Sequence, residues 1–123
     1  MSNTFQGLRT VVYMMPDLKA ATRWYTDILG IEPYFNTPYY VGYNVGGYEL
    51  GLHPQPDEMV AGDNVSAYWG VDDVQATVDK LIAAGATAHE KPSDVGEGII
   101  IASVKDPWGN VFGVINNPHF KPN

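Results

Sequence analysis

A carboxylate near the middle of the chain is the side chain best placed to do chemistry. Glu49 is followed at alternate positions by Gly51 and His53, so the three share one face of an extended strand. Burial among the neighbouring aromatic residues is expected to raise the pKa of Glu49 by desolvation and to make it a general base or an anchor for a cation. The alternative is an exposed strand residue beside the Gly46-Gly47 turn.

Five other residues are candidates for lining a ligand site. Thr10 and Ser66 lie 56 residues apart, at the same position of an internal repeat, and both carry a hydroxyl that can hydrogen-bond a ligand. Tyr68 shares a strand face with Ser66, and Tyr43 falls on an aromatic face of its own strand, so aromatic walls are expected. Trp108 sits in a turn that reaches either a pocket mouth or a dimer contact. For each residue the alternative is ordinary packing.

The chain has few side chains suited to metal binding or nucleophilic attack. It contains no Cys, which excludes disulfides and thiolate sites, and its histidines are His53, His89 and His119, of which the last two are interpreted as surface or tail residues. Seven basic against fourteen acidic residues give a net charge of −7, so nucleic acid is not an expected partner. The acidic surface either attracts a cationic ligand or keeps the protein in solution.

Length and composition indicate one globular domain. The chain has 123 residues, of which 45% are hydrophobic, enough for a core of its own. Residues 1–7 lack the basic and apolar regions of a signal peptide, and no apolar run approaches the roughly 20 residues of a membrane span. We therefore expect a soluble, cytoplasmic protein with no membrane partner.

The elements that must position the candidate residues fall into two similar halves. In the first half, a strand over Leu8–Met15 leads into a helix that Asp17 caps and Gly30 ends. The apolar residues of this helix recur at helical spacing: Leu18, Ala21, Tyr25 and Ile28. Three short strands follow, the last two joined by a Gly-Gly hairpin turn: Glu32–Phe35, Tyr39–Val45 and Tyr48–His53.

The second half follows a polar, Pro-containing connector, residues 54–64. A strand over Val65–Val71 leads into a helix with Asp72 as N-cap, Gln75 at the capping-box position and Gly85 at its end. The predicted apolar face of this helix consists of Val74, Val78, Leu81 and Ile82. Three strands follow, with the turn Asp106-Pro-Trp-Gly109 between the last two: Thr87–Glu90, Ile99–Val104 and Asn110–Ile115.

The two halves repeat in register. Tyr13 matches Trp69 and Asp17 matches Asp73, 56 residues apart in both cases. The repeat indicates an α+β fold built from two copies of a β-α-β-β-β module, with module one at about 8–53, the connector at 54–64, module two at about 65–115 and a tail at 116–123. Two such modules are expected to pair their sheets around one cup-shaped cleft.

Short motifs recur at both helices and at the turns of the second half. The run from Met15 to Gly30 contains an Asp-Leu step, an aromatic-Tyr pair and a final Leu-Gly, and Val71–Val74, Ala84–Ala86 and Asp106–Asn110 are the corresponding marks in the second half. Together they resemble the vicinal oxygen chelate superfamily, which includes glyoxalases, bleomycin-resistance proteins and extradiol dioxygenases. The resemblance covers nearly the whole chain.

The resemblance implies four positions for metal ligands. Family enzymes typically hold a divalent metal, acting as a Lewis acid, with His or Gln from the first strand and Glu from the last strand of each module. Carried over by motif, these positions are Thr10, Glu49, Ser66 and Gly113. Only Glu49 keeps a ligand type, because hydroxyls are poor ligands for transition metals and glycine has no side chain. We expect no metal or other cofactor; the alternative is a shifted site that uses His53.

These departures favour a metal-independent protein that binds a small molecule. The resemblance to bleomycin-resistance proteins implies sequestration of a cationic or aromatic compound and a homodimer. One alternative is a glyoxalase-like lyase or isomerase, or a dioxygenase-related enzyme, with a rearranged site that uses Glu49. Another is an interaction module whose cleft is filled by tyrosine side chains.

Overall fold

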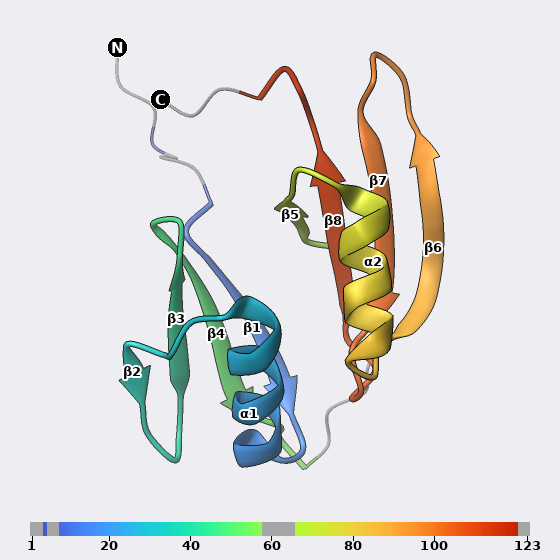
Figure 1. Ribbon diagram of the computed structural model, residues 1–123. Coiled ribbons are helices and arrows are strands. Elements are labelled where there is room, and N and C mark those ends of the chain that lie inside the picture. Colours follow the sequence, from blue (N-terminus) through green and yellow to red (C-terminus); the bar gives the residue numbers. More distant parts are fainter. Residues whose placement is uncertain (1–3, 5–7, 58–65, 121–123) are drawn as a thin grey trace. The chain divides into compact units, whose positions relative to one another are not determined.

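The computed structural model describes residue 4, residues 8–57 and residues 66–120. The chain divides into two compact units, Met1–Met59 and Val60–Asn123. Each unit contains one helix and one four-stranded sheet (Figure 1). Most of the predicted connector, at 58–64, lies outside the described residues, as do Val65 and the end of the predicted tail, 121–123.

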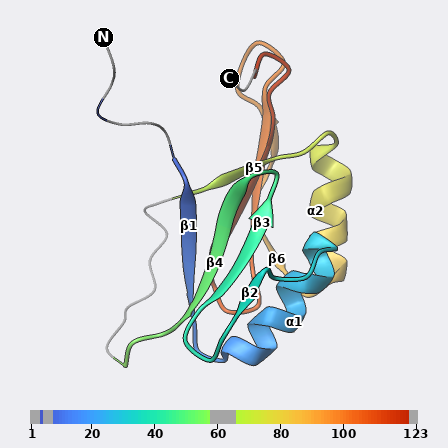
Figure 2. The same ribbon diagram turned by 90° about the vertical axis from the view of Figure 1, so that its left-hand side faces the viewer.

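The first unit has its strands in the order β1-β4-β3-β2, seen side by side in Figure 2. Strand β1 runs parallel to β4, and the other neighbours are antiparallel. The strand predicted over Glu32–Phe35 corresponds to β2, which is shorter and begins later along the chain. The elements are β1 (Thr10–Met15), α1 (Leu18–Leu29), β2 (Phe35–Asn36), β3 (Val41–Val45) and β4 (Tyr48–Pro54).

The second unit repeats this arrangement in the order β5-β8-β7-β6, with β5 parallel to β8. The shared order confirms the α+β class and the two β-α-β-β-β modules. A single domain with a cup-shaped cleft between paired sheets stays a prediction. The elements are β5 (Tyr68–Gly70), α2 (Val74–Ala83), β6 (Thr87–Asp94), β7 (Ile100–Lys105) and β8 (Val111–Asn116).

The helices begin at aspartates 56 residues apart. Asp17 accepts a hydrogen bond from the Ala20 N–H at 3.1 Å, and Asp73 accepts one from the Ala76 N–H at 3.0 Å. Asp72, the predicted N-cap of α2, is therefore one residue too early. Gly30 ends α1 in the left-handed conformation at φ 71°, as predicted. Neither described helix is long and apolar enough to cross a membrane.

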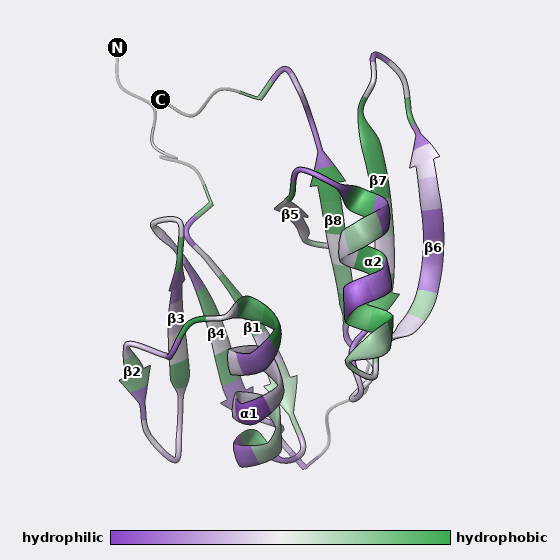
Figure 3. Ribbon diagram, viewed as in Figure 1, coloured by the Kyte–Doolittle hydropathy of each residue, from purple (hydrophilic) through white to green (hydrophobic). Residues whose placement is uncertain are grey.

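Each helix covers one face of its own sheet, and we call the face without a helix the open face of that sheet. In the first unit the covered face holds Tyr25 of α1 against buried strand residues such as Leu50 and Leu52. In the second unit, β7 and β8 are hydrophobic and the edge strand β6 is hydrophilic (Figure 3). Ile82 is 42% exposed, so the covered face of α2 is narrower than predicted. Side chains alternate along a strand, so the residues between the core positions lie on the open face.

Candidate functional site

Two tyrosines hold Glu49 on the open face of the first sheet. The Tyr34 hydroxyl donates a hydrogen bond to Glu49 Oε1, and the Tyr40 hydroxyl donates one to Oε2. Both tyrosines come from the segment between α1 and β3, which the Tyr34 N–H ties to the Gly42 carbonyl at 3.0 Å. Thr37 closes a turn in this segment, since its hydroxyl oxygen accepts from the Tyr40 N–H at 3.0 Å. Each carboxylate oxygen therefore has a fixed donor.

A pair of glycines makes room for the two phenol rings. Gly42 on β3 lies opposite Gly51 on β4 in the antiparallel ladder. A β-carbon at residue 51 would lie 2.6 Å from Tyr40 Cζ, and one at residue 42 would lie 3.3 Å from Tyr34 Cε1. Both rings thus lie against backbone that carries no side chains, and this close approach brings their hydroxyls to Glu49.

The hydrogen bonds shift the pKa values of all three groups in the cluster. The phenol donors Tyr34 and Tyr40 lower the pKa of Glu49, and their effect exceeds the opposing effect of desolvation. The expectation of a raised pKa for Glu49 was therefore wrong. The bond to Glu49 raises the pKa of Tyr34, and burial followed by the bond to Glu49 raises the pKa of Tyr40 to about 12. At neutral pH the cluster is a carboxylate with two protonated phenols.

Thr10 and His53 lie on the same open face as Glu49. Thr10 is the register partner of Glu49 on β1, so their side chains are neighbours. His53 lies four residues along β4, about 13 Å away at about 3.3 Å per residue, and the Tyr40 ring covers the intervening Gly51. His53 Nδ1 lies 2.7 Å from the Pro54 carbonyl oxygen, which only accepts. A metal site that combines Glu49 with His53 does not fit this spacing.

Gly113, a candidate of the second unit, has no room for a ligand side chain. Gly113 on β8 pairs with Tyr68, while Ser66 lies before β5 begins. A β-carbon at residue 113 would lie 2.6 Å from the Ala67 carbonyl oxygen and 2.7 Å from Tyr68 Cδ1. Trp108 is half-buried in the β7–β8 turn, where its backbone N–H donates a hydrogen bond to Asp106 Oδ1 at 2.9 Å.

The residues at the four positions implied by the resemblance do not fit a divalent metal. Gly113 offers no donor and no space for one, and both oxygens of Glu49 already accept phenol hydrogen bonds. Thr10 and Ser66 contribute neutral hydroxyls. Within the described ranges, 4, 8–57 and 66–120, no three His, Asp or Glu side chains form a group able to hold a metal ion.

Tyr43 lies on the helix-covered face, opposite to the predicted site. Its side chain is fully buried, and its hydroxyl lies 2.9 Å from Thr26 Oγ1 and donates to the Thr22 carbonyl at 3.0 Å, both on α1. The structure thus separates Tyr43 from Glu49.

The sequence pattern did not single out Tyr34 and Tyr40. The available signal was the pair of glycines within neighbouring strands, Gly42 and Gly51, because a glycine inside a strand marks a close approach of another group. A second unpredicted pair lies in the other unit, where the Ser103 hydroxyl donates to Glu90 Oε1 at 2.9 Å.

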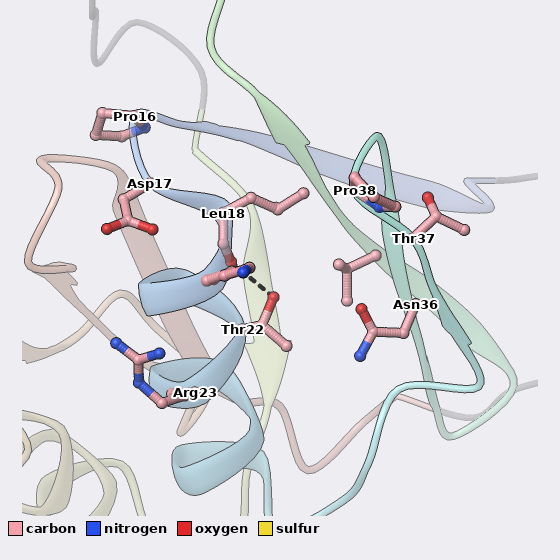
Figure 4. A pocket seen from close by; sticks show the side chains of 10 residues that line it. Pro16, Asp17, Leu18, Thr22, Arg23, Asn36, Thr37 and Pro38 are labelled. Atoms are coloured by element: carbon pink, nitrogen blue, oxygen red, sulfur yellow. Dashed lines mark hydrogen bonds between the residues drawn. The ribbon is translucent and has the colours of Figure 1, made fainter.

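A separate cavity lies on the helix side of the first unit. Its volume is about 690 Å³, and it lies between the start of α1, at Leu18 and Thr22, and the turn at Thr37 and Pro38 (Figure 4). Val41, on the covered face of β3, also lines it. The predicted site residues, all of them described, are absent from its lining.

Comparison with known proteins identifies the family and the fold. The family model of the Glyoxalase/Bleomycin resistance protein/Dioxygenase superfamily matches residues 7–114, whereas no curated protein matches the chain. A glyoxalase-related enzyme from Fulvimarina pelagi is 23% identical, with 97% of this chain and 94% of that chain covered and a TM-score of 0.77. A lactoylglutathione lyase from Agrobacterium tumefaciens is 20% identical, with 94% and 98% covered and a TM-score of 0.73. The chain belongs to the glyoxalase/bleomycin resistance protein/dioxygenase superfamily.

Proposed function

We propose that the protein binds a small organic cation at Glu49, on the open face of the first sheet, without a metal ion. The observation that carries the proposal is the pair of phenol hydrogen bonds from Tyr34 and Tyr40, which hold an ionised carboxylate in place. A preset negative charge beside aromatic rings suits a ligand that is both positively charged and apolar.

The surrounding surface supports the same ligand class. Tyr34, which bonds the carboxylate, is 64% exposed, and Phe35, whose ring centroid lies 6.2 Å from that of Tyr40, is 47% exposed, so aromatic area is open to a ligand. The net charge of −7 adds a long-range attraction for cations. A metal-independent mode is supported by Gly113, which provides neither a ligand atom nor the space for one.

The alternative of an enzyme that uses Glu49 as a general base is less well supported. A general base is most effective when its pKa lies near the working pH. The phenol donors move the pKa of Glu49 in the opposite direction. The cluster is therefore better suited to holding a positive charge than to abstracting a proton.

A binding experiment with one charge series tests the proposal. Benzylammonium and benzyltrimethylammonium are titrated against the protein by NMR, alongside neutral benzyl alcohol and anionic phenylacetate. We expect saturable shifts for a cation at Glu49 and no comparable binding of the other two probes. Glu49→Gln should weaken cation binding by about tenfold, or about 1.4 kcal/mol. Asp27→Asn removes the same charge from an exposed side chain on α1 and is the matched control.

Two outcomes would overturn the proposal. If neither cation binds, or if Glu49→Gln binds as well as the wild type, Glu49 is not a cation site. Elemental analysis of protein purified without chelators tests the metal-independent mode separately. Stoichiometric metal that is lost in Glu49→Gln would contradict that mode and favour the lyase or dioxygenase alternative.

The expected homodimer and cytoplasmic location form part of the same proposal. Sequestration of a small molecule inside the cell needs a binding protein in that compartment, and relatives implied by the resemblance act as dimers. Sedimentation equilibrium of the full chain distinguishes a dimer of about twice the 13.5 kDa chain mass from a monomer.

A further inference from the structure

We infer that the Glu49 site selects cations whose charge is covered by alkyl groups, such as quaternary ammonium or N-alkylpyridinium ions, over cations that carry N–H donors. The inference rests on the proposed function and names its ligand class. Three features of the open face lead to this inference: acceptor atoms that already receive hydrogen bonds within the protein, exposed aromatic rings, and the electron density of those rings.

The acceptors around Glu49 are partly engaged, with about one lone-pair site left on each carboxylate oxygen. A carboxylate offers about four lone-pair sites, and the phenols of Tyr34 and Tyr40 take one on each oxygen. On the same face, Asn44 Oδ1 accepts the Gly47 N–H at 2.8 Å. Thr10 adds a neutral hydroxyl only. An ammonium or guanidinium ion would give up strong hydration and recover few hydrogen bonds.

A cation without N–H groups does not face this loss. Its charge interacts with the Glu49 carboxylate through space, because hydrogen bonding to the phenols leaves the negative charge in place. Its alkyl groups can rest on the exposed ring of Tyr34, which bonds the carboxylate, and on the exposed ring of Phe35. Phe35 and Tyr40 lie close together, with ring centroids 6.2 Å apart and planes at 52°.

The phenol hydrogen bonds also strengthen the rings as cation partners. A phenol that donates its proton toward a carboxylate gains electron density, which makes the face of its ring more negative. Two ring atoms of Tyr34, Cε1 and Cζ, lie close to Gly42, and the residue is 64% exposed to solvent. Such a ring face attracts a diffuse cation by the cation–π interaction.

The test compares two probes that share the benzyl group and the charge, benzyltrimethylammonium and benzylammonium, by NMR titration of the full chain. We expect the trimethyl probe to bind at least about fivefold more tightly to the wild type. In the double variant Tyr34→Phe/Tyr40→Phe the rings remain and the carboxylate oxygens are freed, so benzylammonium should gain affinity and the preference should shrink or reverse. Tyr34→Phe alone changes an exposed side chain and covers the case in which the double variant does not fold.

The outcomes separate this inference from the proposed function. Equal or tighter binding of benzylammonium to the wild type would overturn the selectivity and leave a cation site at Glu49. A preference for the trimethyl probe that survives unchanged in the folded Phe variants would overturn the role of the phenol hydrogen bonds. Failure of both probes to bind would remove the cation site itself.

Discussion

The phenol of Tyr40 lies on the backbone of Gly51, so close that a β-carbon at residue 51 would clash with the Tyr40 hydroxyl oxygen. That hydroxyl also donates to Glu49, two residues earlier on the same strand. The hydrogen bond from Tyr40 to Glu49 therefore depends on the absence of a side chain at residue 51. Any side chain at residue 51 has to displace the phenol.

Gly51→Ala should disturb Glu49 without a change in either hydrogen-bonding residue. Since Tyr40 Oη is the end of a side chain, the ring swings away and its hydrogen bond to Glu49 is lost. We expect a destabilisation of about 1–2 kcal/mol and a rise in the pKa of Glu49 toward its ordinary value of 4.5. Chemical unfolding and an NMR pH titration of the Glu49 carboxyl carbon measure the two effects.

The matched control is Gly70→Ala, another strand glycine whose added β-carbon would have no heavy atom within 4 Å. Its stability should stay within about 0.5 kcal/mol of the wild type, as for an ordinary surface change. An unchanged pKa of Glu49 in Gly51→Ala would show that Tyr40 does not control the carboxylate.

Tyr40 should make stability depend on pH in the alkaline range. Its pKa is raised from an ordinary value of 10.0 to about 12, mainly by burial and then by the bond to Glu49. A group with a raised pKa in the folded state contributes stability that is full below about pH 10 and is lost as the pH rises toward 12. Urea unfolding at pH 9, 10, 11 and 11.5 should show wild type losing its advantage over Tyr40→Phe in this window.

Tyr39→Phe removes a hydroxyl from the same segment, on a side chain that is 78% exposed, and serves as the control. Its stability should follow that of the wild type at each pH. A constant difference between the wild type and Tyr40→Phe from pH 9 to 11.5 would contradict the assigned role of Tyr40.

Gly113→Glu places a carboxylate at a position implied for a metal ligand, yet it should not create a metal site. The new β-carbon would meet the Ala67 carbonyl oxygen at 2.6 Å, and backbone yields less easily than a side-chain end. We expect a destabilisation of about 3 kcal/mol, larger than for Gly51→Ala, and no zinc retained after dialysis. Thermal unfolding measures the destabilisation and elemental analysis measures the zinc. A stable variant with one bound zinc would refute the argument that residue 113 has no room for a metal-binding side chain.

The parts of the fold that depend on local sequence were predictable. An N-cap needs only an aspartate and the N–H three residues later, and the repeat pointed to Asp17 and Asp73 as equivalents. The single-residue error at Asp72 arose because two adjacent aspartates both suit a cap. The left-handed Gly30 and the Gly46-Gly47 hairpin likewise follow from what glycine alone adopts readily.

The candidate site was less predictable because it depends on register between distant strands. Alternation along a strand sorts residues into two sets, but it does not say which set faces the helix. The pairing of Tyr43 with buried Leu50 decides that Tyr43 is core. The donors on Glu49 come from Tyr34 and Tyr40, 15 and 9 residues away, and their approach needs Gly42 opposite Gly51. The sequence suggested desolvation for Glu49, and these donors outweigh it.

Tyr43→Phe should separate stability from ligand binding. Removing the Tyr43 hydroxyl breaks its contact with Thr26 Oγ1 and its hydrogen bond to the Thr22 carbonyl, inside the covered face. We expect a loss of about 1 kcal/mol in the free energy of unfolding, while benzyltrimethylammonium binds with unchanged affinity. The same titration on Tyr40→Phe, which removes one hydroxyl from the open face, should show altered binding. A Tyr43→Phe variant with normal stability and weakened cation binding would return Tyr43 to the ligand site and place the ligand on the helix side of the sheet.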